Sequence, residues 1–101
     1  MDVLDVNTVL RVKRVGDGII GFEIDLPNAP PLIVVRGRRG FIMCGYLDLG
    51  VADKLGLVAV RVSGVSSVED MLDKEVSGVS SKARELGIKV GDKVKDIIDL
   101  V

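Results

Sequence analysis

The most reactive side chain in this sequence is a single thiol, that of Cys44, which stands in an apolar stretch before Gly45-Tyr46. Because the chain has no histidine, a Cys-His pair cannot be built. A lone thiol whose pKa is lowered by a helix N-terminus is the one catalytic role left for Cys44. The alternative is a small buried apolar side chain, the more common role of a free cysteine.

Three arginines lie at a predicted four-residue turn from Gly37 to Gly40: Arg36 precedes it, and Arg38 and Arg39 form its exposed tip. We call residues 36–39 the arginine turn. Their forked guanidinium donors suit phosphate or carboxylate, although an exposed turn carries charged side chains without any ligand. They fall at the other end of the predicted hairpin from Cys44, so within one subunit the two groups do not share a site. Two facing sheet edges in an oligomer would bring them together.

Arg61 lies in a largely apolar strand segment, where a charge needs a partner. We expect that partner to be Asp48 or an acidic residue of another subunit.

Serines follow the apolar runs of the second half of the chain at the points where helices are predicted to begin. If these strands run parallel, their carboxyl ends and the helix N-termini meet at one sheet edge, where free N–H groups attract anions. We expect this edge to be lined by Cys44, Tyr46, Ser63, Ser66 and Ser80. The alternative is that each serine only caps a helix.

No cofactor or metal site is indicated by the sequence. The acidic residues Glu69, Asp70 and Asp73 fall on one short predicted helix, which is not a metal-ligand pattern. Gly16-x-Gly18-x-x-Gly21 matches a dinucleotide fingerprint, but strand-like sequence lies on both sides of it, so we interpret it as a hairpin turn.

The composition argues for one small domain of 101 residues, in which 48% of residues are hydrophobic and the net charge is -1. The mixed charges and the scarcity of aromatic residues argue against nucleic acid as a partner. The apolar runs are too short to span a membrane, and one cysteine cannot form an internal disulfide. We therefore expect a soluble cytoplasmic protein.

Two antiparallel hairpins are predicted in the first half of the chain. In residues 8–26, a three-residue loop, Gly16 to Gly18, pairs Val12 with Phe22 and Arg11 with Glu23, which keeps the apolar side chains on one face. Residues 32–47 are apolar without alternation, which is typical of strands buried on both faces. These residues form the predicted central hairpin.

Short strands and helices are predicted to follow. Asp48 is predicted to cap a helix over residues 49–55, and Ser66 to open a capping box with Glu69. A third helix is capped by Ser80 or Ser81 and ends at Gly87. Asp92 is predicted to cap a last helix, which carries an apolar stripe. The strands 57–62 and 76–79 are expected to form a parallel crossover.

These elements predict an α+β fold, with α/β as the alternative. The sheet is mixed: antiparallel N-terminal hairpins come first, short βα units follow, and a helix ends the chain. We expect a single domain over residues 1–101, with a β-rich oligomerisation region over 1–31 and an α/β core over 32–101.

Four segments of this chain form a recognisable set: the stretch from Val35 to Leu47, Ala52-Asp53-Lys54-Leu55-Gly56, Ala59 to Val65 and Ser80 to Gly87. Together they resemble the YunC-like family, a small domain of unknown function in bacteria and archaea. The resemblance implies a compact α/β-type domain whose β-rich N-terminal region tetramerises. It implies no activity, ligand or catalytic residue.

The leading functional hypothesis is a small homo-oligomeric cytoplasmic protein, because the predicted apolar surface exceeds what a monomer of this length easily covers. The alternative is an enzyme or a binder of a small anionic ligand that uses the strand-end serines, Cys44 or the arginine turn. A third hypothesis is regulation through a protein partner.

Overall fold

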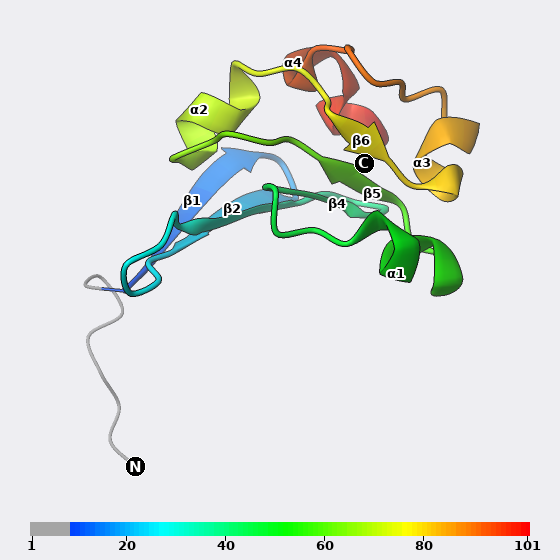
Figure 1. Cartoon of the computed structure of the whole chain (residues 1–101). Coiled ribbons are helices and arrows are strands. Elements are labelled where there is room, and N and C mark those ends of the chain that lie inside the picture. The colour runs from blue at the N-terminus through cyan, green and yellow to red at the C-terminus, as the bar shows by residue number, and fades with distance from the viewer. Residues whose placement is uncertain (1–8) are drawn as a thin grey trace.

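The computed structural model describes residues 9–101, in which one six-stranded sheet lies at the centre (Figure 1). Its strands lie side by side in chain order: β1 Leu10–Gly16, β2 Ile19–Ile24, β3 Leu32–Arg36, β4 Phe41–Met43, β5 Ala59–Arg61 and β6 Gly78–Val79. Neighbours are antiparallel except β4 and β5, which are parallel. The predicted α+β fold with a mixed sheet is confirmed.

The first hairpin has the predicted register. Val12 is paired with Phe22 and Arg11 with Glu23, and Gly18 takes the left-handed conformation with φ 74°. Strands flank the glycine motif on both sides, so it is a hairpin turn and not a dinucleotide loop. The predicted first residue of this hairpin, Thr8, lies outside the described residues.

Two of the predicted helices begin and end where their local signals indicate. Helix α1, Leu49–Lys54, starts after Asp48, whose carboxylate accepts hydrogen bonds from two N–H groups of the first turn. Helix α3, Ser81–Glu85, starts after Ser80, whose hydroxyl accepts from the N–H of Ala83. Side-chain caps of this kind depend on nearby sequence alone, which is why they could be predicted.

Helix α2, Val68–Leu72, begins one residue later than predicted. Its cap is Ser67, whose hydroxyl accepts from the Asp70 N–H at 3.0 Å. The carboxylate of Asp70 accepts from the Ser66 N–H at 3.0 Å, a role that we expected of Glu69. Glu69 instead forms an ion pair with Lys13 at 2.8 Å.

The last helix, α4 Val94–Ile97, continues into a 3-10 turn over Ile98–Leu100. The prediction that Asp92 caps this helix is wrong. The Asp92 carboxylate accepts a hydrogen bond from the Lys89 N–H, and no side chain caps α4. The predicted apolar stripe nevertheless docks, since Val94, Ile97 and Val101 are buried.

The predicted parallel crossover between residues 57–62 and 76–79 is also wrong, because β5 and β6 are antiparallel. Helix α2 does not pack beside β5. It extends across the sheet to contact β2 and β3, and the chain then returns in the opposite direction to form β6. The parallel connection of this fold is β4-α1-β5.

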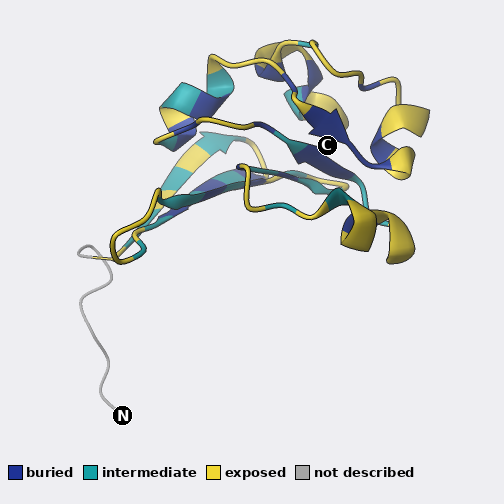
Figure 2. Cartoon of the chain, in the orientation of Figure 1, coloured by how far each residue is buried: buried dark blue, intermediate teal, exposed yellow. Residues whose placement is uncertain are grey.

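The sheet has two unlike faces. Helices α2, α3 and α4 lie on one side of it, whereas α1 lies on the other side near β5 (Figures 1 and 2). The core between the sheet and the three helices is apolar and includes Ile33, Val35, Ile42, Val60, Val62, Met71, Ile88 and Val94. We call this side the covered face and the opposite side, over β1 to β4, the open face.

Residues 32–47 lie at the centre of the sheet as predicted, but this single chain buries them on one face only. Along β3 and β4 burial alternates: Ile33, Val35 and Ile42 are buried, whereas Val34 and Phe41 are half-buried. The reason is that all helices near these strands lie on the covered face.

Among residues 9–101, no helix has the length and apolar character that crossing a membrane requires.

Candidate functional site

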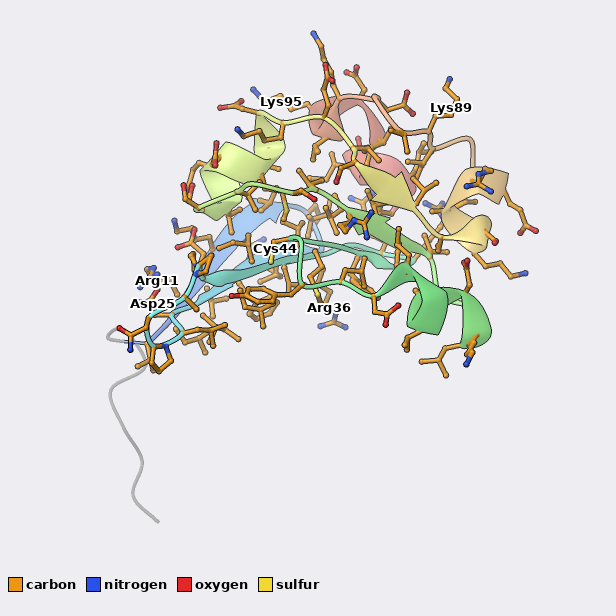
Figure 3. The ribbon with its side chains drawn as sticks, viewed as in Figure 1. Arg11, Asp25, Arg36, Cys44, Lys89 and Lys95 are labelled. Atoms are coloured by element: carbon orange, nitrogen blue, oxygen red, sulfur yellow. The ribbon has the colours of Figure 1, made fainter. Side chains whose placement is uncertain are left out.

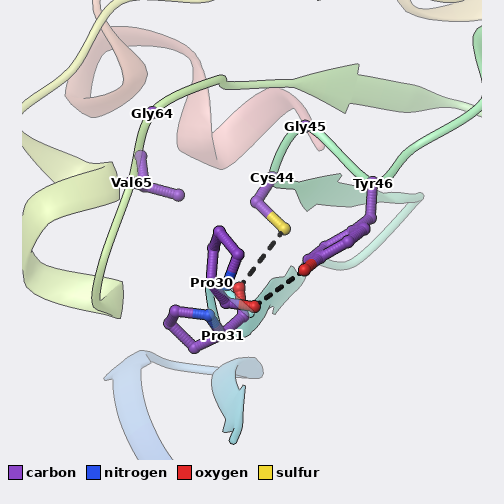
Figure 4. Close-up of a pocket in the computed structure, with 7 residues that line it drawn as sticks. All are labelled: Pro30, Pro31, Cys44, Gly45, Tyr46, Gly64 and Val65. Atoms are coloured by element: carbon purple, nitrogen blue, oxygen red, sulfur yellow. Dashed lines mark hydrogen bonds between the residues drawn. The ribbon is translucent and has the colours of Figure 1, made fainter. Parts of the chain in front are cut away.

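A cavity of about 320 Å³ lies at the carboxyl ends of the parallel strands β4 and β5 (Figure 4). Three segments far apart in the sequence line it: Pro30 and Pro31 before β3, Cys44 to Tyr46 after β4, and Gly64 and Val65 after β5. No charged side chain lines this cavity, which we call the Cys44 pocket. Ligands of open α/β sheets bind at such strand ends.

Hydrogen bonds hold two walls of the Cys44 pocket together. The Tyr46 hydroxyl donates to the Pro30 carbonyl at 2.8 Å, and the Cys44 sulfur lies 3.9 Å from the Pro31 carbonyl (Figure 4). The same sulfur accepts from the Ile33 N–H at 3.4 Å. Cys44 is only 4% exposed, so the thiol is the floor of the pocket.

The structure brings three of the five residues predicted for this edge close together. Cys44 and Tyr46 line the pocket, and a Cβ on Gly45 would lie 3.8 Å from the Ser63 hydroxyl. Ser63 in turn contacts the Ser77 hydroxyl at 3.2 Å.

Ser80 lies at the other end of the strands from the Cys44 pocket. The prediction that it shares one sheet edge with Cys44, Tyr46, Ser63 and Ser66 is therefore wrong. Its hydroxyl donates to the Leu57 carbonyl and accepts from the Ala59 N–H at the amino end of β5. The reason is the antiparallel direction of β6, which carries the residue after this strand away from the pocket.

The N-termini of α1, α2 and α3 already have acidic side chains of this chain as acceptors. Asp48 accepts from the first turn of α1, and Asp53 accepts from the Ser81 N–H at 2.7 Å. At α2, the Glu23 carboxylate accepts from the Val68 N–H at 2.7 Å, and Ser66 bonds to Asp70. The chain therefore supplies its own anions where an anionic ligand was expected.

The arginine turn also has acceptors within the chain. The Arg38 guanidinium donates to the Asp17 carbonyl at 2.7 Å, and Arg39 donates to the Asp99 and Leu100 carbonyls at 3.2 and 3.5 Å. Arg36 points to the open face instead (Figure 3). The turn thus fastens the last residues of the chain and the first hairpin loop to the central hairpin.

The partner expected for Arg61 is not Asp48, since no ion pair of Arg61 occurs within residues 9–101. Its guanidinium lies over Gly78, where a Cβ would come within 3.0 Å of it.

A buried charge on the covered face was not predicted. Glu23 is 3% exposed and lies within 2.9 Å of both Arg11 and Lys13. Burial raises the pKa of Glu23, but the hydrogen bonds from Val68, Arg11 and Lys13 outweigh it and lower the pKa to about 2. The predicted register of the first hairpin could have indicated this ion pair, because it places Arg11 opposite Glu23.

No group of three or more cysteine, aspartate or glutamate side chains in residues 9–101 is arranged to hold a metal ion.

Comparisons with known proteins agree with this fold. A family described as "Domain of unknown function (DUF1805)" matches residues 43–101. The chain is 41% identical over 80 residues to the uncharacterized protein YunC of Bacillus subtilis (strain 168). The aligned residues cover 75% of this chain and 78% of that protein.

A solved structure is also similar. The crystal structure of TA1206 from Thermoplasma acidophilum, a protein of unknown function, is 36% identical and has a TM-score of 0.85, with 91% of this chain and 92% of that chain covered. The family match spans more than half of the chain, and the YunC relative covers three quarters of it. This chain therefore belongs to the DUF1805 family and is YunC-like.

Proposed function

We propose that this chain is a homo-oligomeric module of the cytoplasm that assembles through the open face of its sheet, with a tetramer as the final state. The tetramer is the state that the YunC-like resemblance implies. The single free thiol, buried at Cys44, suits a reducing compartment.

The observation that carries this proposal is the composition of the open face. The strand registers align nine apolar side chains on it: Leu10, Val12, Ile20, Phe22, Ile24, Leu32, Val34, Phe41 and Met43. They form neighbouring rows across four strands, and Val12 is 57% exposed. Contiguous apolar patches of this kind are typical of interaction surfaces rather than of the free surface of a monomer.

The charges on this face limit how a second copy can pack against it. The charged residues in these rows are Arg14 and Arg36, and neither forms an ion pair within residues 9–101. When association removes water from a guanidinium, that group requires an acceptor. Because the open face carries no carboxylate in these rows, we expect carboxylates or main-chain carbonyls from outside the open face of the neighbouring copy to supply it.

The test is sedimentation velocity of the full chain and two matched variants. Val12→Asp places a charge on the open face, whereas Val90→Asp places the same charge at a valine that is 64% exposed elsewhere. We expect the parent chain and Val90→Asp to sediment as tetramers and Val12→Asp as smaller species. A parent chain that sediments as a monomer at micromolar concentration contradicts the proposal.

Binding of an anionic small molecule by the arginine turn has less support. Arg38 and Arg39 already donate to main-chain carbonyls, and Arg36 points to the open face. A thermal shift on adding inorganic phosphate, absent in Arg38→Ala, would favour this second function.

A further inference from the structure

We propose that the Cys44 pocket is a binding site for a small uncharged molecule with an apolar, ring-sized body. This site is separate from the open face and does not depend on self-association. It shares Cys44 and Tyr46 with the anion site expected from the sequence, but prolines, glycines and a valine line it in place of the serines, and its ligand is uncharged.

The size and place of the cavity fit a ligand site. Its volume of about 320 Å³ lies at the lower end of the roughly 300–1,000 Å³ usual for small-molecule pockets. It lies beyond the carboxyl ends of two adjacent parallel strands, where the chain leaves β4 toward α1 on one side of the sheet and leaves β5 toward α2 on the other (Figure 1).

The walls are held in place, so the cavity cannot simply collapse. Pro30 and Pro31 have fixed φ angles, and the Tyr46 hydroxyl is bonded to the Pro30 carbonyl. Gly64 takes a left-handed conformation with φ 75°, and the next residue, Val65, is anchored in the core at 7% exposure. The hollow is open to solvent on one side, so an apolar molecule that enters it removes its apolar walls from water and gains dispersion contacts with them.

The lining also selects against charge. It consists of proline, glycine and valine together with the Tyr46 ring and the Cys44 sulfur, and contains no lysine, arginine, aspartate or glutamate. A carboxylate that enters such a site loses its hydration without gaining an ion pair, which is costly. The Tyr46 oxygen, which already donates to Pro30, keeps lone pairs that accept a hydrogen bond from a neutral ligand.

The first experiment is an NMR titration of the full chain with benzamide and with benzoate, which have nearly the same shape but differ in charge. We expect benzamide to cause saturable shifts of the Gly45, Gly64 and Val65 amide signals at millimolar concentration, and benzoate to cause shifts at least about tenfold weaker at equal concentration. Equal effects of the two probes, shifts spread over the whole chain, or no shifts overturn the proposal.

The second experiment uses Cys44, the one cysteine of the chain, as a reporter. Its alkylation rate is measured with iodoacetamide, with and without benzamide. We expect benzamide to slow the reaction in the folded protein and to leave the rate of the urea-unfolded chain unchanged. A rate that benzamide does not change in the folded protein contradicts the proposal.

Val65→Phe fills the pocket, and Val90→Phe adds the same ring at an exposed valine. We expect the benzamide shifts to disappear in Val65→Phe and to persist in Val90→Phe. If Val65→Phe does not fold, the titration of the parent chain alone decides, because it needs no variant.

Discussion

On the first hairpin, the two faces of the sheet distribute polar and apolar groups in opposite ways. The covered face holds the charges of Arg11, Lys13 and Glu23, whereas the open face holds Val12 and Phe22, with Arg14 as its charged residue. The chain thus covers the more polar face of this hairpin with its own helix and leaves the more apolar face open. This arrangement is stable on the covered face because every charge there has a partner, and it leaves the apolar face available to another molecule.

The largest expected difference between the faces comes from two adjacent valines of β3. Val35 is 1% exposed on the covered face, and Val34 is half-buried on the open face. Val35→Asp buries a charge without a partner, so we expect it to lower the free energy of unfolding by more than about 4 kcal/mol.

We expect Val34→Asp to leave the chain folded but to impair association. Circular dichroism and urea unfolding measure the first effect, and sedimentation measures the second. If both variants unfold to the same extent, the open face is part of the core of a single chain and our description of two unlike faces is wrong.

The buried carboxylate gives the covered face a specific pH dependence. The pKa of Glu23 is lowered from 4.5 to about 2, so its contribution to stability is complete above pH 4.5 and disappears as the pH falls from 4.5 to 2. We expect Glu23→Gln to cost roughly 2–3 kcal/mol at pH 7, because three hydrogen bonds to a charged group are weakened.

Urea unfolding at several pH values checks this prediction, with the exposed Glu85→Gln as the control. The difference between the parent chain and Glu23→Gln should narrow between pH 4.5 and pH 2. A difference that stays constant over this range would mean that the Glu23 charge contributes nothing.

A smaller effect is expected at Ser80, whose hydroxyl joins β5 to α3 on the covered side. Ser80→Ala leaves the Ala59 N–H and the Leu57 carbonyl without their partner, and it removes the cap of α3. We expect a loss of about 1–2 kcal/mol in the free energy of unfolding. Ser63→Ala, at an exposed serine, is the matched control, and equal losses would refute the structural role of Ser80.

The smallest effect is expected at the arginine turn. Arg39→Ala removes hydrogen bonds to the Asp99 and Leu100 carbonyls but keeps the main-chain bond from the Arg39 N–H to the Val101 carbonyl at 2.8 Å. We expect a loss below about 1 kcal/mol, because the side chain is exposed. A larger loss in urea unfolding would show that this side chain holds the end of the chain more strongly than we infer.

The parts of the fold that could be predicted from the sequence depend on short-range signals. The first hairpin followed from matching the faces of facing residues such as Val12 and Phe22, and α1 followed from Asp48 and Gly56. Both signals lie within a few residues of the element that they define.

The features that could not be predicted depend on contacts between distant segments. The direction of β6 follows from the contact of α2 with β2 and β3, and the position of Ser80 follows from that direction. The buried charge of Glu23 depends on Val68, which is 45 residues away. The Cys44 pocket joins three separate segments, so the sequence indicated Cys44 and Tyr46 but not the proline wall opposite them.

The most direct test of our account is hydroxyl-radical footprinting of the parent chain and of Val12→Asp at the same protein concentration. Phe22 and Met43 report on the open face. Leu86, a 38% exposed leucine at the end of α3 on the covered side, reports on surface outside the open face. We expect Phe22 and Met43 to be protected in the parent chain and oxidised faster in Val12→Asp, with Leu86 unchanged. Equal oxidation of Phe22 and Met43 in both proteins would contradict the claim that other copies of the chain cover the open face.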